Sequence, residues 1–335
     1  MSKKKSTVHD TRPVGPRAPD GKPRLRVGVV GTGHMGKNHV RVLSEIPDAM
    51  LVGIYDQKPE VAAELARRFD TTSFASPEDL WQEADAVVLA VPTFAHVNLG
   101  VELLQRGLHV LVEKPIASSL EEADQLIAAC GPEQILSIGH VEFYNPAVQA
   151  VLDLEVVPRF IEAQRLSPFT PRSLDVDVLL DLMIHDLQLL HAMDPSPVKE
   201  VRCTGIDVLS SKVDIASARI ELESGATANI TASRVSGEPV RKLRVFAHHR
   251  YFSVDYREQD VKGFGLVKKA DESRVIVPEE VPVERAEPLR AELDAFVAAC
   301  RGTPDVRYVD GPQGRRALET ALAVRDAIGA PSNGG

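Results

Sequence analysis

Two groups of polar side chains interrupt apolar segments of this chain. Glu113-Lys114-Pro115 directly follows the apolar run His109–Val112, and Asp181 and His185 lie four positions apart in an apolar helical stretch. A spacing of four places two side chains on one helix face, one turn apart. A carboxylate there can orient an imidazole and raise its basicity, as a general base requires. We therefore expect His185 to be a base oriented by Asp181, with Lys114 offsetting negative charge on the reacting oxygen. The alternatives are a surface lysine and a core histidine.

A glycine-rich segment near the N-terminus has the pattern of a dinucleotide site. An apolar strand runs into Gly31-Thr32-Gly33-His34-Met35-Gly36, where Gly31 permits a tight turn and Gly33 lets the backbone approach a pyrophosphate. Gly36 permits close helix packing, and free N–H groups at the helix start hold the anion. Asp56 ends the next strand, where a carboxylate can bind both ribose hydroxyls of NAD and would repel the 2′-phosphate of NADP. We therefore predict that NAD is preferred to NADP. The alternative is that the glycines only allow a tight turn.

Strands and helices alternate from residue 24 to residue 139. Continuous apolar strands such as Ala86–Val91 are separated by amphipathic helical segments such as Pro59–Phe69. This pattern predicts an α/β Rossmann domain, a doubly wound parallel sheet with helices on both faces. Ligands bind such sheets at the carboxyl ends of the strands. The residues expected at that edge are Gly31–Gly36, Asp56, Val91-Pro92-Thr93, Glu113-Lys114-Pro115 and Gly139-His140.

The second half of the chain has a different period. Ala216–Leu222 and Ala226–Ala232 alternate strictly around Glu223-Ser224-Gly225, which predicts a hairpin. We expect an α+β domain with a large, open, mostly antiparallel sheet and helices on one face, ending in helices Leu289–Cys300 and Gly311–Ile328. Its uncovered face predicts a homodimer or homotetramer. The expected division is a disordered tail at 1–23, an NAD-binding domain at 24–145, and a substrate-binding and oligomerisation domain at 146–330.

Composition and charge narrow the class of protein. The net charge of −9 over 335 residues argues against nucleic acid as the main partner. The three cysteines form no CxxC pair, so we expect a reducing cytoplasm and neither a disulfide frame nor a metal site. The most apolar stretches, such as Ala86–Pro92, are far shorter than the roughly 20 residues of a membrane span. These features predict a cytoplasmic protein that acts on a small molecule.

The combined motifs resemble those of the glucose–fructose oxidoreductase/inositol dehydrogenase (Gfo/Idh/MocA) family. The resemblance rests on the order and spacing of Gly31-x-Gly33-x-x-Gly36, Glu113-Lys114-Pro115, Asn145-Pro146 and Asp181-x-x-x-His185, and it covers residues 24 to about 328. It implies an NAD(P)-dependent dehydrogenase of sugars or polyols in which Lys114, Asp181 and His185 surround the reacting carbinol. It also implies that His96 lies near the nicotinamide. The other cofactor contacts expected are His34, Met35, Pro92, Thr93 and Glu113.

A narrower resemblance is to the branch of this family that oxidises UDP-N-acetylglucosamine at C3, whose product is aminated for lipid A. It rests on Gly139–Glu142, Arg165–Phe169, Asp175–Asp186 and Thr231–Ser236. The substrate contacts expected are Glu142, Asn145, Arg165, Arg172 and Arg234, with the three arginines and Lys242 as candidate pyrophosphate donors. Phe143 stands where that branch is expected to carry arginine. The alternatives are dehydrogenation of inositol or another free sugar, and a non-catalytic NAD-sensing protein.

Overall fold

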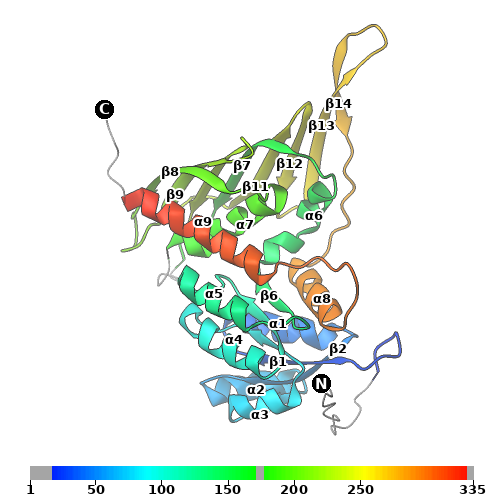
Figure 1. Cartoon of the computed structure of the whole chain (residues 1–335), viewed down its shortest axis with the longest axis vertical. Helices are drawn as coiled ribbons and strands as arrows, with labels where there is room; N and C mark the ends of the chain where they lie inside the picture. The colour runs from blue at the N-terminus through cyan, green and yellow to red at the C-terminus, as the bar shows by residue number, and fades with distance from the viewer. Residues whose placement is uncertain (1–16, 171–176, 330–335) are drawn as a thin grey trace, which may run out of the picture.

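The computed structural model describes residues 17–170 and 177–329, which form two sheets placed end to end along the long axis of the molecule (Figure 1). The first sheet has six strands and the second has eight. Within the described ranges, none of the helices combines the length and apolar character needed to cross a membrane. Arg172, one of the predicted substrate contacts, lies outside the described residues.

The first sheet confirms the predicted Rossmann architecture. It is parallel throughout, with the strand order β3-β2-β1-β4-β5-β6. The strands are β1 Leu25–Val30, β2 Ala49–Tyr55, β3 Thr72–Ser73, β4 Ala86–Leu89, β5 His109–Glu113 and β6 Leu136–Gly139. The connecting helices are α1 His34–Glu45, α2 Pro59–Arg68, α3 Pro77–Glu83, α4 His96–Gln105 and α5 Leu120–Ala129. The strand order reverses between β1 and β4, and ligands bind such sheets at this switch point.

The second sheet confirms the predicted open, mostly antiparallel architecture. Its order is β14-β13-β12-β11-β7-β10-β9-β8, and only the β7–β10 pair is parallel. The strands are β7 Pro158–Leu166, β8 Val198–Ile206, β9 Ile215–Leu222, β10 Thr227–Ser233, β11 Val240–Ala247, β12 Arg250–Asp255, β13 Asp260–Lys268 and β14 Arg274–Glu279. Helices α6 (Pro146–Leu152), α7 (Ile184–Met193) and α9 (Gly311–Gly329) cover one face (Figure 1).

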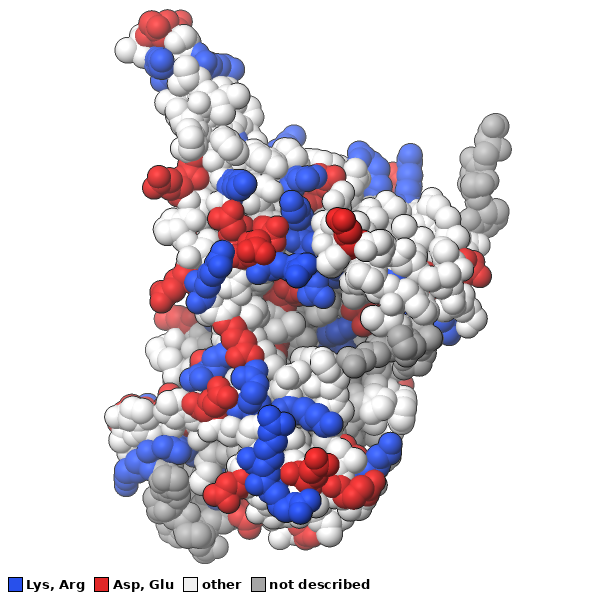
Figure 2. Space-filling view, turned by 180° about the vertical axis from the view of Figure 1, so that it is seen from behind, with Lys and Arg blue, Asp and Glu red and all other residues white. Residues whose placement is uncertain are grey.

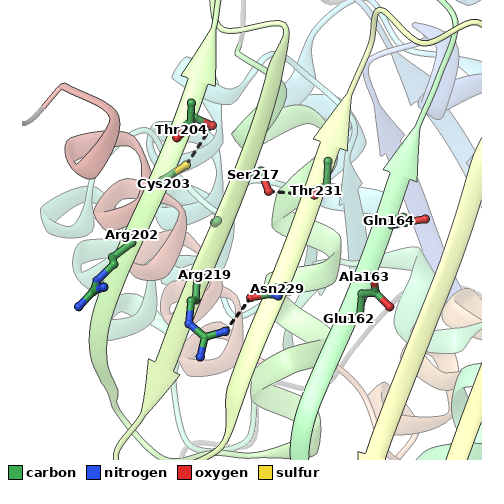
Figure 3. Close-up of a pocket in the computed structure, with 11 residues that line it drawn as sticks. Glu162, Ala163, Gln164, Arg202, Cys203, Thr204, Ser217, Arg219, Asn229 and Thr231 are labelled. Atoms are coloured by element: carbon green, nitrogen blue, oxygen red, sulfur yellow. Dashed lines mark hydrogen bonds between the residues drawn. The ribbon is translucent and has the colours of Figure 1, made fainter. Parts of the chain in front are cut away.

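The opposite face of this sheet carries polar side chains from β7, β8, β9 and β10. They line a shallow hollow of about 470 Å³, across which Ser217 bonds to Thr231 and Arg219 bonds to Asn229 (Figure 3). Strict alternation along β9 and β10 produces this polar face, because the other side chains of both strands point into the core. The role of this face in oligomerisation remains a prediction.

The helix expected from about Leu174 to Met193 is not a uniform α-helix. Within the described residues it contains a π turn, η3 (Leu179–Met183), which leads into α7. The N–H of Ile184 bonds to the carbonyl of Leu179, five residues earlier. A π turn inserts one residue into the helical repeat and so rotates the side chains that precede it relative to those that follow. The expectation of a regular α-helix through Asp181 and His185 is therefore wrong.

Two segments differ from the expected domain plan. Helix α8 (Pro288–Cys300) does not cover the second sheet, because Leu289, Leu293 and Phe296 pack with α1 in the core of the first sheet. Residues 17–23, expected to belong to a disordered tail, form a turn closed by a bridge between Arg17 and Pro23. Asp20 in this turn forms an ion pair of 2.7 Å with Arg301, just beyond α8.

Candidate active site

The glycine segment between β1 and α1 forms a cradle that side chains would fill. Gly31 has φ +89°, and a Cβ there would lie 2.3 Å from the carbonyl oxygen of Ala90. A Cβ on Gly36 would lie 1.9 Å from the carbonyl oxygen of Gly31, whereas a Cβ on Gly33 would meet nothing within 4 Å. Gly33 also precedes α1 with no side-chain cap on the helix. Open N–H groups at a helix start with space in front of them fit a pyrophosphate.

Asp56 directly follows β2 beside this cradle and holds the loop in place. Its Oδ2 accepts hydrogen bonds from the N–H (2.6 Å) and hydroxyl (2.7 Å) of Thr32, and its Oδ1 accepts one from the N–H of Lys58 (2.9 Å). Partial burial opposes ionisation, but the hydrogen bonds from Lys58 and Thr32 outweigh it and lower the pKa of Asp56. The carboxylate is therefore charged at neutral pH, at the position where a cofactor ribose is expected.

Pro92, Thr93 and His96 follow the carboxyl end of β4, where a ligand is expected. Pro92 and Thr93 begin the turn η1 (Thr93–Ala95), at the carboxyl end of β4. His96 is buried, and its two ring nitrogens lie 2.9 Å from the carbonyl oxygens of Val91 and Pro115. Its ring therefore connects the ends of two strands, and burial lowers its pKa. Both ring nitrogens face the main chain, and the expected position of His96 near the nicotinamide stays a prediction.

Both carboxylate oxygens of Glu113 have partners within the protein. Its Oε1 lies 2.7 Å from Nε2 of the buried His39 on α1, and its Oε2 accepts a hydrogen bond of 3.2 Å from the N–H of Lys114. Glu113 therefore connects α1 to the end of β5 and fixes the backbone from which the Lys114 side chain projects.

Lys114 and Asp181 meet where the two sheets face each other. Nζ of Lys114 donates to the main-chain carbonyl of Asp181 at 2.7 Å and to its Oδ1 at 3.2 Å. The carbonyl belongs to the π turn, and such turns are frequent at functional sites. The expected pairing of Asp181 with His185 is not found, because the described residues contain no hydrogen bond between them. Asp181 contacts Lys114 instead.

His185 packs against a second histidine that sequence reasoning placed at the sheet edge but did not include in the site. The rings of His140 and His185 meet edge to face, with centroids 5.9 Å apart and planes at 88°. Burial and the positive charge of Lys114 lower the pKa of His140 to about 3 and that of His185 well below its usual range. Both rings are neutral at neutral pH. Among the residues that the structure describes, Nδ1 of His185 is buried without a hydrogen-bond partner.

Arg165 is not available to a substrate, contrary to expectation. Its guanidinium is buried, donates to both carboxylate oxygens of Asp186 (2.8 and 3.0 Å) and to Oε1 of Glu142 (2.6 Å), and lies over the ring of Tyr256. A guanidinium with these partners connects β7 to α7 and to the turn η2 (Val141–Tyr144). Glu142, also an expected substrate contact, is therefore held by arginine.

The other expected substrate residues also have structural partners. Arg234 is buried and donates to Asp214 (2.8 Å) and to the hydroxyl of Ser210 (3.0 Å). Asn145 caps α6, since its Oδ1 accepts from the N–H of Ala147, and its amide donates to the carbonyl of Tyr256. Neither side chain is placed to bind a substrate directly.

Arg241 on β11 is a cation that sequence reasoning missed. Its Nη1 lies 3.2 Å from Oε1 of Glu142, and 40% of its side chain is exposed. Alternation along β11 was the available signal, because it places Arg241 with Leu243 and Val245 on the covered face. Lys242, the residue considered instead, is exposed on the opposite face.

Comparison with known proteins finds similarity over both sheets. The model of an oxidoreductase family with an NAD-binding Rossmann fold, named GFO_IDH_MocA, matches residues 25–140. The chain is 38% identical over 310 residues to UDP-N-acetylglucosamine 3-dehydrogenase of Acidithiobacillus ferrooxidans, covering 91% of this chain and 97% of that protein. A solved structure of that dehydrogenase superposes with a TM-score of 0.85 at 37% identity, covering 91% of this chain and 98% of that one.

A more distant relative shows how far this architecture extends. The NAD⁺-dependent scyllo-inositol 2-dehydrogenase of Bacillus subtilis is 25% identical over 314 residues, covering 86% of this chain and 90% of that protein.

Proposed function

Because this chain belongs to the Gfo/Idh/MocA family of NAD-binding oxidoreductases, we propose that it oxidises a ring hydroxyl of a nucleotide sugar, specifically the C3 hydroxyl of UDP-N-acetylglucosamine. The observation that carries this proposal is the contact of Lys114 with Asp181 at the ligand edge of the first sheet, with buried His185 close enough for the charge of Lys114 to lower its pKa. The sugar is inferred from the relative that is similar over nearly its whole length.

The residues present fit NAD. The glycine cradle would hold the pyrophosphate on the N–H groups of Gly33 and of the first turn of α1, and Asp56 would bind the ribose hydroxyls. His34 and Met35 begin α1 directly after the cradle, and Pro92 and Thr93 border the carboxyl end of β4. When bound, NAD supplies the hydride acceptor.

The protein's own part in the reaction is to move a proton and stabilise charge. Neutral His185 accepts the hydroxyl proton at Nε2, and its low pKa keeps it unprotonated before the reaction. Lys114 donates a hydrogen bond to the reacting oxygen and offsets its developing negative charge. Asp181 positions Lys114 through two contacts, one from its carbonyl and one from its carboxylate.

The proposed product is a 3-keto nucleotide sugar, which an aminotransferase can use as its substrate. The diamino sugar that the aminotransferase forms would then enter lipid A synthesis. We place the enzyme in the cytoplasm, where such a substrate is available. We also propose that it forms a homodimer or homotetramer through the uncovered face of the second sheet, because a large open sheet face is usually buried by a partner.

The test is NADH formation, followed by absorbance, with UDP-N-acetylglucosamine or myo-inositol as substrate. We expect turnover of the nucleotide sugar and a large but measurable fall in its kcat/KM in Lys114→Met. Lys199→Met, a change at an exposed lysine on β8, is the matched control. Turnover of inositol alone would establish a polyol dehydrogenase. Tight NAD binding with no turnover of any sugar would establish an NAD-sensing protein instead.

A further inference from the structure

Two arginines lie side by side on the covered face of the second sheet. Arg165 on β7 and Arg241 on β11 are directly opposite each other in the antiparallel register. Both donate to Oε1 of Glu142, at 2.6 Å and 3.2 Å. Cross-strand partners point to the same face, so both guanidinium groups approach this carboxylate from neighbouring strands.

The two arginines differ in how many of their donors are used. Arg165 is buried and bonds to both Asp186 and Glu142. Arg241 makes one side-chain hydrogen bond within the described residues, and 40% of its side chain is exposed. A guanidinium carries five N–H donors in a planar fork that matches two oxygens of a phosphate. Arg241 therefore retains donors that can reach a ligand, whereas Arg165 does not.

Arg241 lies close enough to His185, the proposed base, for its charge to act on that ring. Glu142 lies two residues after His140, whose ring packs against that of His185. The positive charge of Arg241 is among those that lower the pKa of His185, after burial, Lys114, Arg165 and His140. Seen from behind, the molecule is hollowed at mid-height between its two halves, and basic and acidic side chains both border the hollow (Figure 2).

Glu142 can hold Arg241 while it occupies only one of the nitrogen donors of the guanidinium. Arg165 holds Glu142 from the buried side. Burial alone would raise the pKa of Glu142, but the positive charges of Arg165 and Arg241 outweigh this effect and lower it. The carboxylate is therefore charged at neutral pH and is held between two arginines. It accepts from one nitrogen of Arg241, and 40% of the Arg241 side chain stays exposed.

We propose that Arg241 binds the phosphate oxygens of a nucleotide-sugar substrate and so distinguishes it from a free sugar, with Glu142 as its positioning residue. This inference rests on the proposed function and names the recognition element of the same site. Of the expected donors within the described residues, Arg165 and Arg234 bond to buried carboxylates and Lys242 is on the uncovered face, so these three do not compete for this role.

The experiment compares Arg241→Gln with Arg244→Gln, a matched change on the same strand at an arginine that pairs with Glu162. We expect Arg241→Gln to raise the KM for UDP-N-acetylglucosamine and the inhibition constant of UDP by about 10- to 100-fold, the range for a charged hydrogen bond. The kcat, the KM for NAD and inhibition by free N-acetylglucosamine should change by less than about threefold, and Arg241→Lys should recover part of the loss.

The outcomes separate this inference from the proposed function. Wild-type turnover of UDP-N-acetylglucosamine with an unchanged KM in Arg241→Gln would overturn the role of Arg241 alone. Equal losses for UDP and for free N-acetylglucosamine would also overturn it. If the wild type does not oxidise UDP-N-acetylglucosamine but binds UDP, and Arg241→Gln weakens that binding, the proposed function fails and the role of Arg241 stands. Should Arg241→Gln not fold, Arg241→Lys serves for the same comparison.

Discussion

Replacing Asp181 by asparagine separates two possible roles of this carboxylate. In the structure Asp181 contacts Lys114, whereas the sequence pattern assigned it to His185. Asparagine keeps the size of the side chain and the main-chain carbonyl that accepts from Nζ at 2.7 Å. The substitution therefore removes only the charge, 3.2 Å from the lysine.

The size of the loss follows from this geometry. Two unit charges 3.2 Å apart attract by about 5 kcal/mol at an effective dielectric constant of about 20. The Lys114 and Asp181 side chains are 19% and 26% exposed, so water screens part of this attraction. The carbonyl contact also remains. We expect a loss of about 1.5–3 kcal/mol, the range for a charged hydrogen bond, which is about 10- to 150-fold in kcat/KM.

A double-mutant cycle measures which partner transmits this loss. The kcat/KM for UDP-N-acetylglucosamine is measured for Asp181→Asn, Lys114→Met and the double variant. If Asp181 acts through Lys114, Asp181→Asn should cost less than about threefold once Lys114 is methionine. Asp177→Asn is the matched control, because Asp177 lies just before the same π turn and asparagine can keep its hydrogen bonds to the N–H groups of Leu179 and Leu180.

Additive losses from Asp181→Asn and Lys114→Met would contradict the proposed coupling of Asp181 to Lys114. A tenfold or larger cost of Asp181→Asn in the Lys114→Met background would show that Asp181 acts on another group. Disappearance of the cost in a His185→Gln background would then identify that group as His185, as the sequence pattern suggested.

Three further changes test the cofactor site and the buried histidines. Gly36→Ala should abolish NAD binding in calorimetric titration, because its Cβ would lie 1.9 Å from the carbonyl oxygen of Gly31; unchanged affinity would contradict the cradle. Asp56→Ser should shift the NAD-to-NADP preference in kcat/KM toward NADP by at least about tenfold, since the repelling carboxylate is gone; an unchanged ratio would remove Asp56 from cofactor choice. His140 has a folded pKa of about 3 against 6.5 for the free side chain, so the unfolded chain takes up a proton first and stability falls as the pH drops from 6.5 toward 3. Between pH 7 and pH 5 the free energy of unfolding, measured with urea, should therefore fall by about 2 kcal/mol less in His140→Gln than in the wild type. Equal decreases in the two proteins would contradict the low pKa of His140.

Local signals in the sequence predicted the elements of the first sheet well. Ser76 and Ser119, serines of the type that favours helix starts, cap α3 and α5, since each hydroxyl accepts from an N–H three residues later. The glycine spacing and Asp56 located the cradle, because each position has a steric or electrostatic requirement that few residue types meet. Such signals depend on neighbours in the chain.

The partners of charged residues were not predictable in the same way. Arg165 and Arg234 look like exposed cations in the sequence, and only the tertiary fold brings Asp186 and Asp214 to them. The direction of Asp181 was missed for a different reason. A period of 3.6 residues carries no sign of the additional residue in a π turn, so the expected regular α-helix was wrong there.

The docking of α8 on the first sheet has a consequence for how the protein is made. Leu289, Leu293 and Phe296 complete the core around α1, although they are synthesised long after β6. A ribosome-bound chain that has produced only the cofactor-binding half exposes the apolar surface of α1 that α8 will cover. We therefore expect stable NAD binding to require the last part of the chain, and we expect a truncated product that lacks α8 to be bound by chaperones or degraded.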